Sequence, residues 1–367
     1  MAYCALQVQS GIAVKIYRTA SFSRSLLVAG LLSLSSLPAS RLSAMSAAIG
    51  TTFCTKARGE RLDSPALSGR NLVWLAHPGA RADIYGRSLP SGRTFVVSAD
   101  GTAATGLGGP VISGRTVVWV DCRLCVRASG LPGFRNTGIY ARNVPEGQTR
   151  LLSLAGQNPY DPAVSGHVVV WVGHDGRRSD IYGRNLHTDR LFRISSSGTA
   201  TAPSISGSVV VWQDRRGGTW DIYGRNLRAN REFLVARHHG RNYLENPLVS
   251  KATVVWANWR SDGSVEIDGE ELPTRHKFEV AVIPFGHYNP ELGPKVAVSG
   301  RFVVWDQTRG KRDFPASAYE VRGKDMSTGR EFSIPGAERG QSSPAISGRM
   351  VVWAANRQIC GASLTAG

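Results

Sequence analysis

The chain has 367 residues, 42% of them hydrophobic, so it is too long for a disulfide-dependent miniprotein and too apolar for a disordered chain. Its 41 glycines and 18 prolines, against 19% charged residues, exclude a fold of long salt-bridged helices and favour a mostly β protein. The formal net charge of +17 suits acidic partners such as nucleic acid, anionic glycans or an anionic membrane surface, and the charge alone does not choose among them.

Residues 1–48 contain the three parts of a secretory signal. Basic residues without any acid precede a leucine-rich run over 26–37, which ends at Pro38 and is followed by Ser46-Ala47-Ala48. A disordered cytosolic leader is the alternative interpretation. No other stretch is long and apolar enough to cross a bilayer. We therefore expect a leader over 1–48, one domain over 49–367, and a secreted or periplasmic protein without a transmembrane span.

A repeat that ends in tryptophan fills the rest of the chain and occurs seven times. The copies are SPALSGRNLVW, GPVISGRTVVW, DPAVSGHVVVW, APSISGSVVVW, NPLVSKATVVW, PKVAVSGRFVVW and SPAISGRMVVW, which end at Trp74, Trp119, Trp171, Trp212, Trp256, Trp305 and Trp353. A polar loop follows each tryptophan, then a phrase such as DIYGRNL, then a phrase such as FRIS. A repeat of this kind is the sequence signature of a solenoid or a propeller.

Each unit supplies four short strands, because each phrase is rich in β-branched and aromatic residues and is bounded by turn residues. Runs such as Val168-Val169-Val170-Trp171 do not alternate with polar residues, which is typical of strands buried on both faces. Four strands in about 45 residues predict an all-β fold, a seven-bladed β-propeller of four-stranded blades.

The seventh unit ends after its third strand, so the ring needs a strand from elsewhere. Thr52-Phe53-Cys54-Thr55 matches the FRIS phrase and lies before the first Pro65 motif at the usual interval. An unpaired seventh blade would leave open sheet edges. We therefore expect this N-terminal strand to complete the last blade and close the ring.

The order P-x-[IV]-S-G, V-V-W, D-x-R, D-I-Y and F-x-I-S resembles the WD-like propeller repeat of TolB-type proteins. The resemblance covers essentially the whole chain after the leader. It implies an extracytoplasmic location and binding of a protein or a glycan, although a fold does not establish a function. We expect a member of the repeat family rather than TolB itself, because no separate α/β domain fits before residue 64.

Four cysteines remain after the predicted leader, and an even number in an exported protein favours pairing. Cys54 and Cys360 fall on neighbouring strands of the last blade, but the aligned register predicts a diagonal offset of two residues, so their disulfide requires a bulge or a shift of one pair. Cys122 and Cys125 form a C-x-x-C in a loop. A zinc site would require two more ligands at comparable spacing, and none lies nearby in the sequence, so we expect a local disulfide or a thiol pair.

Residues that recur in every unit are interpreted as structural. The repeated tryptophans are expected to pack between blades. Asp83, Asp180 and Asp221 precede Ile-Tyr and are expected to accept loop hydrogen bonds rather than to act as acids. A catalytic group is needed only once, whereas these residues appear several times.

Binding residues are expected where the repeat is broken, in the loops between the second and third strands. The second and sixth units carry long insertions there, and these loops should share one face of the ring with the blade connections. Arginine binds carboxylate, sulfate or phosphate, and exposed tryptophan stacks on sugars or bases. A scattered arginine surface is the alternative interpretation. The candidate binding residues are Arg123, Arg127, Arg215, Arg216, Trp220, Trp259, Arg260, Arg309 and Arg312.

The sequence also leaves an enzyme open. His238, His239, His276 and His287 do not belong to the repeat, and metal-dependent polysaccharide lyases on seven-bladed propellers use histidine clusters. No metal-spacing motif joins them, and no G-x-S-x-G motif is present. In the fifth unit Glu266, Asp268, Glu270 and Glu271 replace the usual IYGRN pattern, which we interpret as an acidic strand edge.

The hypothesis from sequence is an exported, monomeric, non-catalytic scaffold without a cofactor that binds a protein or an anionic polysaccharide at the cell envelope. A carbohydrate-active enzyme is the alternative. Nucleic acid is permitted by the charge but disfavoured by the export signal.

Overall fold

The structure is a computed structural model that describes residues 49–56, 61–77, 82–89, 92–104, 106–123, 125–127, 134–240, 242–284, 287, 293–308, 319–335, 340–355 and 357–365. The predicted leader lies outside these residues, so the leader and the domain boundary stay predictions. Nowhere in the described ranges is there a helix that could cross a membrane.

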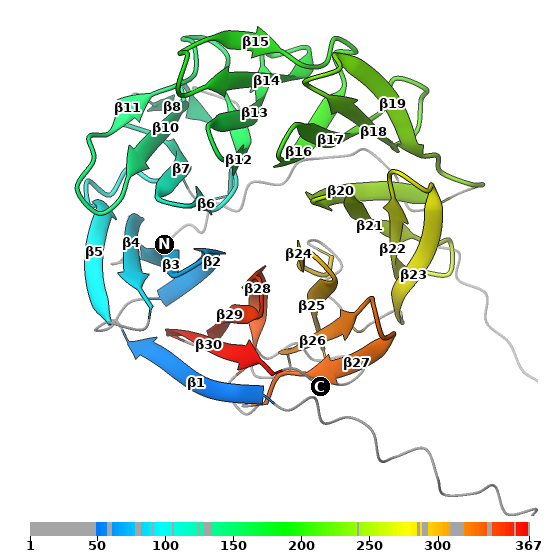
Figure 1. Cartoon of the computed structure of the whole chain (residues 1–367). Helices are drawn as coiled ribbons and strands as arrows, with labels where there is room; N and C mark the ends of the chain where they lie inside the picture. The colour runs from blue at the N-terminus through cyan, green and yellow to red at the C-terminus, as the bar shows by residue number, and fades with distance from the viewer. Residues whose placement is uncertain are drawn as a thin grey trace, which may run out of the picture.

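Seven four-stranded antiparallel sheets stand around a central axis, as predicted (Figure 1). We name the strands of each blade A to D from the axis outward. Blade 1 contains β2 (Arg61–Ser68), β3 (Asn71–His77), β4 (Asp83–Ser88) and β5 (Arg93–Ser98). Blade 2 contains β6 (Val111–Ser113), β7 (Thr116–Asp121), β10 (Gly138–Asn143) and β11 (Arg150–Leu151). Blade 3 contains β12 (Tyr160–Ser165), β13 (Val168–His174), β14 (Ser179–Asn185) and β15 (Leu191–Arg193).

The remaining blades repeat this order, A to D. Blade 4 contains β16 (Ala200–Ser206), β17 (Val209–Asp214), β18 (Asp221–Asn226) and β19 (Arg231–Ala236). Blade 5 contains β20 (Tyr243–Ser250), β21 (Thr253–Trp259), β22 (Val265–Glu271) and β23 (His276–Ile283). Blade 6 contains β24 (Val296–Ser299), β25 (Phe302–Thr308), β26 (Tyr319–Asp325) and β27 (Arg330–Ser333). Blade 7 contains β28 (Ser342–Ser347), β29 (Met350–Ala355), β30 (Gln358–Leu364) and β1 (Ile49–Lys56). A small hairpin, β8 (Val126–Arg127) and β9 (Phe134–Arg135), lies in the insertion of blade 2.

The ring closes as the sequence predicts, because β1 pairs antiparallel with β30 and supplies strand D of blade 7. The predicted diagonal offset of the two cysteines is wrong. Cys54 lies directly opposite Cys360, and the two form a disulfide with their Cα atoms 4.0 Å apart. The same register pairs Tyr182 with Arg193 in blade 3, where a four-residue turn lets the Asn185 N–H donate to the Arg190 carbonyl.

The repeated tryptophans pack between blades, as expected. All seven are at most 4% exposed. The apolar clusters each combine two neighbouring blades; for example, Trp119 of blade 2 packs with Val73 and Ile84 of blade 1. The interface between blades 7 and 1 is built in the same way, with Trp74 beside Val352 and Ile359. The runs of unbroken apolar residues therefore reflect burial on both faces of each B strand.

The glycine of the IYG phrase makes room for the aromatic ring of strand D. A Cβ atom on Gly183 would lie 2.8 Å from the ring of Phe192, and one on Gly361 would lie 2.6 Å from the ring of Phe53. Blade 2 has Ala141 at this position and Arg150 opposite it on strand D, so this blade has neither the glycine nor the aromatic ring. The match between Gly361 and Phe53 explains why a strand from the far end of the chain fits blade 7.

The Ser-Gly pair that ends strand A forms a closed ring of hydrogen bonds around the axis. In each blade the serine hydroxyl accepts the main-chain N–H of the A–B turn in the following blade. The seven donor and acceptor pairs, at 2.8 to 3.0 Å, are Gly114 to Ser68, Gly166 to Ser113, Gly207 to Ser165, Lys251 to Ser206, Gly300 to Ser250, Gly348 to Ser299 and Gly69 to Ser347. We call this set the serine ring.

Replacing both Cys54 and Cys360 by Ser should lower the stability of the protein. The disulfide closes a loop with a sequence separation of 306, and cross-links across long loops restrict the unfolded chain most. We expect the free energy of unfolding to fall by about 4 kcal/mol. Denaturant unfolding of the oxidised wild type and the double variant measures the difference. A midpoint that does not move would contradict this role; replacing Cys122 and Cys125, whose loop spans three residues, serves as the control.

Lys251→Gly should raise stability. Lys251 occupies the turn position that is glycine in the other six blades, and its φ is +56°, a left-handed conformation that favours glycine. The serine ring uses only the main-chain N–H here, so the substitution keeps that bond. We expect a gain of about 1 kcal/mol in thermal or denaturant unfolding. The reciprocal Gly207→Lys, at φ +58°, should lose about as much, and a neutral result in both variants would refute the argument.

Candidate functional site

The topology gives the propeller two different faces. The A–B and C–D turns lie on one face, which we call the turn face. The B–C loops and the connections between blades lie on the other, which we call the connector face. Arg123, Arg215, Arg216 and Arg260 all lie in B–C loops of the connector face, as expected from sequence. Trp220 precedes β18 and Trp259 ends β21 on the same face. Arg127 lies on β8, whose side chains are not described, and Arg309 and Arg312 lie outside the described residues.

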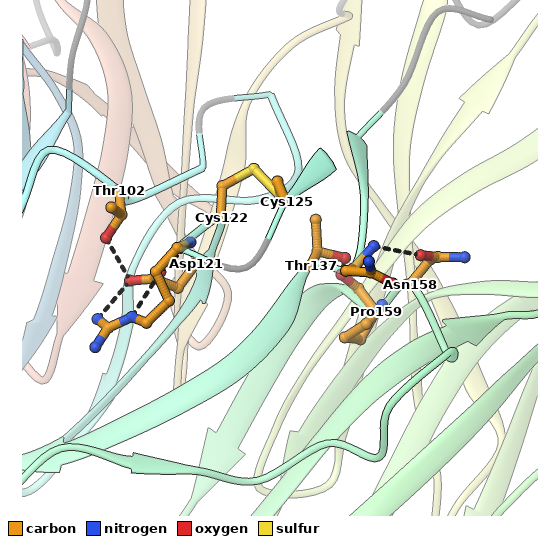
Figure 2. The surroundings of a disulfide bond; sticks show 9 residues. Thr102, Asp121, Cys122, Cys125, Thr137, Asn158 and Pro159 are labelled. Carbon is orange, nitrogen blue, oxygen red and sulfur yellow. Dashed lines mark hydrogen bonds and ion pairs between the residues drawn. A yellow bond between two sulfur atoms is a disulfide. The ribbon is translucent and has the colours of Figure 1, made fainter. Parts of the chain in front are cut away.

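Arg123 is held by partners within the protein. Its guanidinium donates to the buried carboxylate of Asp121 at 2.8 and 2.9 Å and lies 4.4 Å from the ring centroid of Tyr140. Asp121 also accepts the Trp119 indole N–H. It accepts the Thr102 hydroxyl as well (Figure 2). Burial opposes ionisation of Asp121, but hydrogen bonds from Arg123 and Trp119 outweigh it and lower its pKa. The D-x-R motif is therefore a structural unit in this blade.

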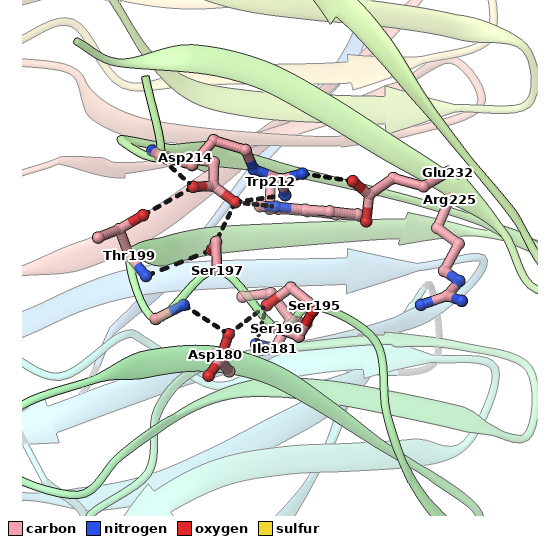
Figure 3. Close-up of polar contacts among 12 residues, drawn as sticks. Asp180, Ile181, Ser195, Ser196, Ser197, Thr199, Trp212, Asp214, Arg225 and Glu232 are labelled. Carbon is pink, nitrogen blue, oxygen red and sulfur yellow. Dashed lines mark hydrogen bonds and ion pairs between the residues drawn. The ribbon is translucent and has the colours of Figure 1, made fainter. Parts of the chain in front are cut away.

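Blade 4 contains the same unit. Arg216 donates to the carboxylate of Asp214 at 2.7 Å and lies 4.0 Å from the ring centroid of Tyr223. The Asp214 side chain is completely buried and accepts hydrogen bonds from the Trp212 indole and from two hydroxyls of the preceding connection (Figure 3). Burial opposes ionisation of Asp214, but the hydrogen bond from Arg216 and those from Thr199 and Ser197 lower its pKa.

The adjacent disulfide belongs to the same region of blade 2. Cys122 and Cys125 are bonded to each other, which confirms the local pair expected from the C-x-x-C spacing (Figure 2). The bond joins the residues on either side of Arg123.

The other candidates of the connector face do not form one cluster. Arg215 donates to the Gly218 carbonyl within its own loop at 3.1 Å. Arg260 pairs with Glu266 at 2.8 Å. Trp259 stacks on Tyr243, with ring centroids 5.7 Å apart and an interplanar angle of 7°. These residues come from blades 4 and 5, and the arginines among them already have internal partners.

The four histidines lie on different faces. His238 follows the end of strand D of blade 4 on the connector face, where its imidazole contacts Asp221 at 2.8 Å and Thr219 at 2.8 Å. His276 begins strand D of blade 5 on the turn face, so it cannot meet His238. His287 contacts the Thr308 carbonyl. Within the described ranges, no three His, Cys, Asp or Glu side chains are grouped so that they could hold a metal ion.

The acidic strand of blade 5 is explained by neighbouring side chains. Asn258 donates to both Glu266 and Asp268, at 3.2 and 2.8 Å. Burial and the neighbouring carboxylates raise the pKa of Glu266. The buried Glu270 takes the position of the arginine in IYGRN and pairs with Arg275 at 2.8 Å.

Arg275 in turn takes over the role of the missing arginine. In blades 2, 3 and 4 the arginine at the position of Arg in IYGRN donates to a main-chain carbonyl of the preceding blade, in strand D or just after it. Arg184, for example, donates to the Leu152 carbonyl at 2.7 Å. In blade 5 the guanidinium of Arg275 reaches the carbonyls of Leu234 and Val235. The departure from the repeat in blade 5 therefore preserves the contact between blades.

Cationic side chains gather on the turn face, which the sequence interpretation overlooked. The A–B turns, all of them described, contain no acid. The turn-face cations are Arg70, Arg93, Arg115, Arg150, Arg190, Arg228, Arg231, Lys251, Arg275, Arg301, Arg330 and Arg349, and the acids in the described part of these turns are Glu146, Asp189, Glu271 and Asp325. On the connector face, carboxylates neutralise many of the arginines in pairs such as Arg193 with Asp180. On the turn face Arg150, Arg275 and Arg301 also pair with carboxylates, but the cations named there still outnumber the acids.

A cleft of about 650 Å³ opens on the turn face between blades 2 and 3. Its cationic and ionisable lining consists of Arg115, Arg142, Arg150, His167, His187 and one acid, Glu146. Arg115 uses its Nε to donate to the Val144 carbonyl, and the rings of His167 and His187 lie 5.9 Å apart. Guanidinium and imidazole donors around one cavity favour a carboxylate, sulfate or phosphate ligand. The available sequence signal was the basic residue that follows Ser-Gly in Ser113-Gly114-Arg115 and Ser165-Gly166-His167.

The comparisons with known proteins support the fold. No protein-family model and no curated protein matches the chain by sequence. The oligogalacturonate lyase of Vibrio parahaemolyticus matches in structure with a TM-score of 0.59 and 10% identity, over 86% of this chain and 97% of that one. An oligogalacturonate lyase in complex with manganese gives 0.58 and 10%, over 86% and 91%. TolB from Acinetobacter baumannii gives 0.50 and 14% over 77% of this chain, which spans 66% of the length of that protein.

At these identities the likeness shows the fold alone. It confirms a propeller with TolB-like structural neighbours, which is the resemblance that the repeat motifs indicated. The neighbours include both TolB and a lyase, so the fold does not choose between a scaffold and an enzyme.

Asp214→Ala should destabilise the protein by about 3 kcal/mol, because it leaves Arg216 and the Trp212 indole without their shared acceptor. Denaturant unfolding checks this, with Glu146→Ala, an exposed position, expected to stay within about 0.5 kcal/mol. Asp214 has a lowered pKa, so its contribution to stability is present above the unfolded pKa of about 3.9 and is lost as the pH falls through its folded value. The difference between wild type and variant should therefore shrink in acid. A variant as stable as wild type at pH 7 would rule out the structural role.

Proposed function

We propose that the protein is an exported, monomeric and non-catalytic propeller that binds an anionic glycan outside the cytoplasm. The observation that carries the proposal is the excess of arginine and lysine on the turn face, where few carboxylates balance them. Such a surface attracts a polyanion from a distance, and guanidinium groups bind carboxylate and sulfate with directed hydrogen bonds.

The turn face supports this proposal better than the connector face that the sequence pointed to. Arg123 and Arg216 are each committed to a buried carboxylate and a tyrosine ring, so displacing them would leave a buried charge without a partner. The cleft between blades 2 and 3, in contrast, is lined by three guanidinium groups, and only Arg150 among them pairs with a described carboxylate, that of Asp189; Arg115 and Arg142 donate to main-chain carbonyls. We infer export from the predicted leader. We favour a glycan over a protein partner because the positive charge is repeated from blade to blade and spread over the face.

The placement of the histidines supports binding rather than lyase chemistry. His238 and His276 lie on opposite faces, and His238 is already bonded to Asp221 and Thr219. The neighbours that are oligogalacturonate lyases act on an anionic sugar polymer, and their likeness extends to the fold alone. An anionic polysaccharide is therefore the ligand to test first, with an acidic protein as the second candidate.

The experiment compares binding of polygalacturonate, a sulfated glycan and neutral dextran to the purified protein at two salt concentrations. We expect both anionic polymers to bind and to weaken as salt rises, and dextran not to bind. The variant Arg70→Glu/Arg228→Glu/Arg349→Glu changes exposed turn-face positions and should lose at least about tenfold in affinity.

The matched control is Arg177→Glu/Arg215→Glu/Arg237→Glu, which makes the same charge change at exposed positions of the connector face. It should change affinity by less than about twofold. Equal losses in both variants would mean that only net charge matters, and no binding of either anionic polymer would refute the proposal.

A further inference from the structure

Blade 3 lacks the ion pair that fills the same position in blades 2 and 4. Two residues after the repeated tryptophan, blades 2 and 4 have Asp121 and Asp214, whereas blade 3 has Gly173. Two residues further on, they have Arg123 and Arg216, whereas blade 3 has Asp175. The tryptophan and the tyrosine of the unit remain. Blade 3 therefore keeps the aromatic frame of the unit and has lost both the carboxylate and the guanidinium that occupy it elsewhere.

A pocket of about 390 Å³ stands at this position. It is lined by Gly173, His174, Asp175, Arg178, Asp180, Tyr182 and Arg193 and, from the connection before the blade, by residues 155–157. The deep end is closed, because the ring of Tyr182 lies against Gly173 and the Gln157 side chain accepts the Trp171 indole at 3.4 Å. The pocket lies beside Tyr182, whose counterparts in blades 2 and 4, Tyr140 and Tyr223, have a guanidinium over the ring.

The charges of the pocket are mostly satisfied, with one exception. Arg193 donates to Asp180 at 2.5 Å and to the Ser195 carbonyl, and Asp180 also accepts the Ser195 hydroxyl (Figure 3). Arg178 donates to the Ser196 carbonyl. Asp175 accepts only the main-chain N–H groups of Arg177 and Arg178, both on one oxygen. These bonds, together with the nearby charges of His174 and Arg178, lower the pKa of Asp175, which keeps the exposed carboxylate ionised.

We propose that this pocket binds a guanidinium group, the side chain of an arginine supplied by a protein partner. Blades 2 and 4 show the occupant that this frame accepts, since a guanidinium lies 4.4 and 4.0 Å from the equivalent tyrosine centroids. In blade 3 the position of that arginine is taken by Asp175, a carboxylate at the mouth of the pocket. An incoming guanidinium therefore meets an anion and an aromatic face together. The site lies on the connector face and is independent of glycan binding on the turn face.

The probe is N-acetyl-arginine amide, and N-acetyl-citrulline amide is its neutral isostere. Ligand-observed NMR on the full protein should show binding of the arginine compound and at least about tenfold weaker binding of the citrulline compound. Asp175→Asn should weaken arginine binding by about fivefold. Asp262→Asn is the matched control, because Asp262 is also an exposed loop aspartate that accepts a main-chain N–H, and it should leave binding unchanged.

The decisive variant is Gly173→Asp/Asp175→Arg, which restores the D-x-R sequence of blades 2 and 4. A Cβ on Gly173 would lie 2.7 Å from the present Tyr182 ring, so the ring must move, as the tyrosines of those two blades allow. We expect this filled variant to fold, by circular dichroism and thermal unfolding, and to lose arginine binding. If it does not fold, Asp175→Asn and the citrulline comparison still decide the proposal.

Three results would overturn the proposal: equal binding of citrulline, retained binding by the folded filled variant, or displacement of the arginine compound by a neutral monosaccharide. Sedimentation at rising protein concentration identifies the source of the guanidinium. A dimer formed by wild type and not by the filled variant would assign it to a second copy of this arginine-rich chain, and a monomer in both would exclude a second copy as the source.

Discussion

The serine ring is the constraint on which the rest of the propeller depends. Each serine hydroxyl at the end of strand A accepts the turn N–H of the next blade, so the distance between neighbouring blades near the axis is set at every interface, including the seam between Ser347 and Gly69. A ring of this kind is satisfied only when it closes, because an open end would leave a serine and a turn amide unpaired. The donor is always a main-chain N–H, as Lys251 shows by replacing glycine without losing the bond. The side chains that follow the serine are therefore free to vary, and on this face they are mostly basic.

The replacements within the repeat show that the contacts between strands and blades are kept while residues change. In blade 2 the glycine and the aromatic ring of strand D are replaced together, by Ala141 and Arg150 where blade 3 has Gly183 and Phe192. Arg275 reaches the preceding blade from the C–D turn when Glu270 occupies the usual arginine position. This second replacement keeps a carbonyl contact between blades, which is what a close-packed stack of sheets requires. Gly173 and Asp175 differ from these replacements, because blade 3 has given up the ion pair that blades 2 and 4 keep.

The sequence predicted the features that depend on local pattern and failed where geometry across strands decides. Seven Trp-ended phrases were enough for the blade count, and the missing FRIS phrase located the closing strand at Phe53. The register of Cys54 and Cys360 was wrong because it depends on how many residues the C–D turn uses, which a strand pattern does not record. Arg123 and Arg216 were read as ligand contacts because the tyrosine beneath each guanidinium lies on the next strand, about 7 to 17 residues further along the chain. The cleft between blades 2 and 3 was missed because its lining comes from turns of two different repeats.

The two faces differ in how many of their arginines pair with carboxylates, and this difference bears on function more directly than the formal net charge of +17. On the connector face, aspartates at the ends of strands B and C hold arginines in buried or half-buried pairs, so the cations there stabilise the blades. On the turn face, the serine ring fixes the backbone with main-chain donors, and the cations outnumber the carboxylates even though Arg150, Arg275 and Arg301 have acidic partners. Charge that the fold does not neutralise repels itself, and an anionic ligand relieves that repulsion. Blade 3 keeps the tryptophan and the tyrosine but has lost both members of the D-x-R pair that blades 2 and 4 supply on the connector face.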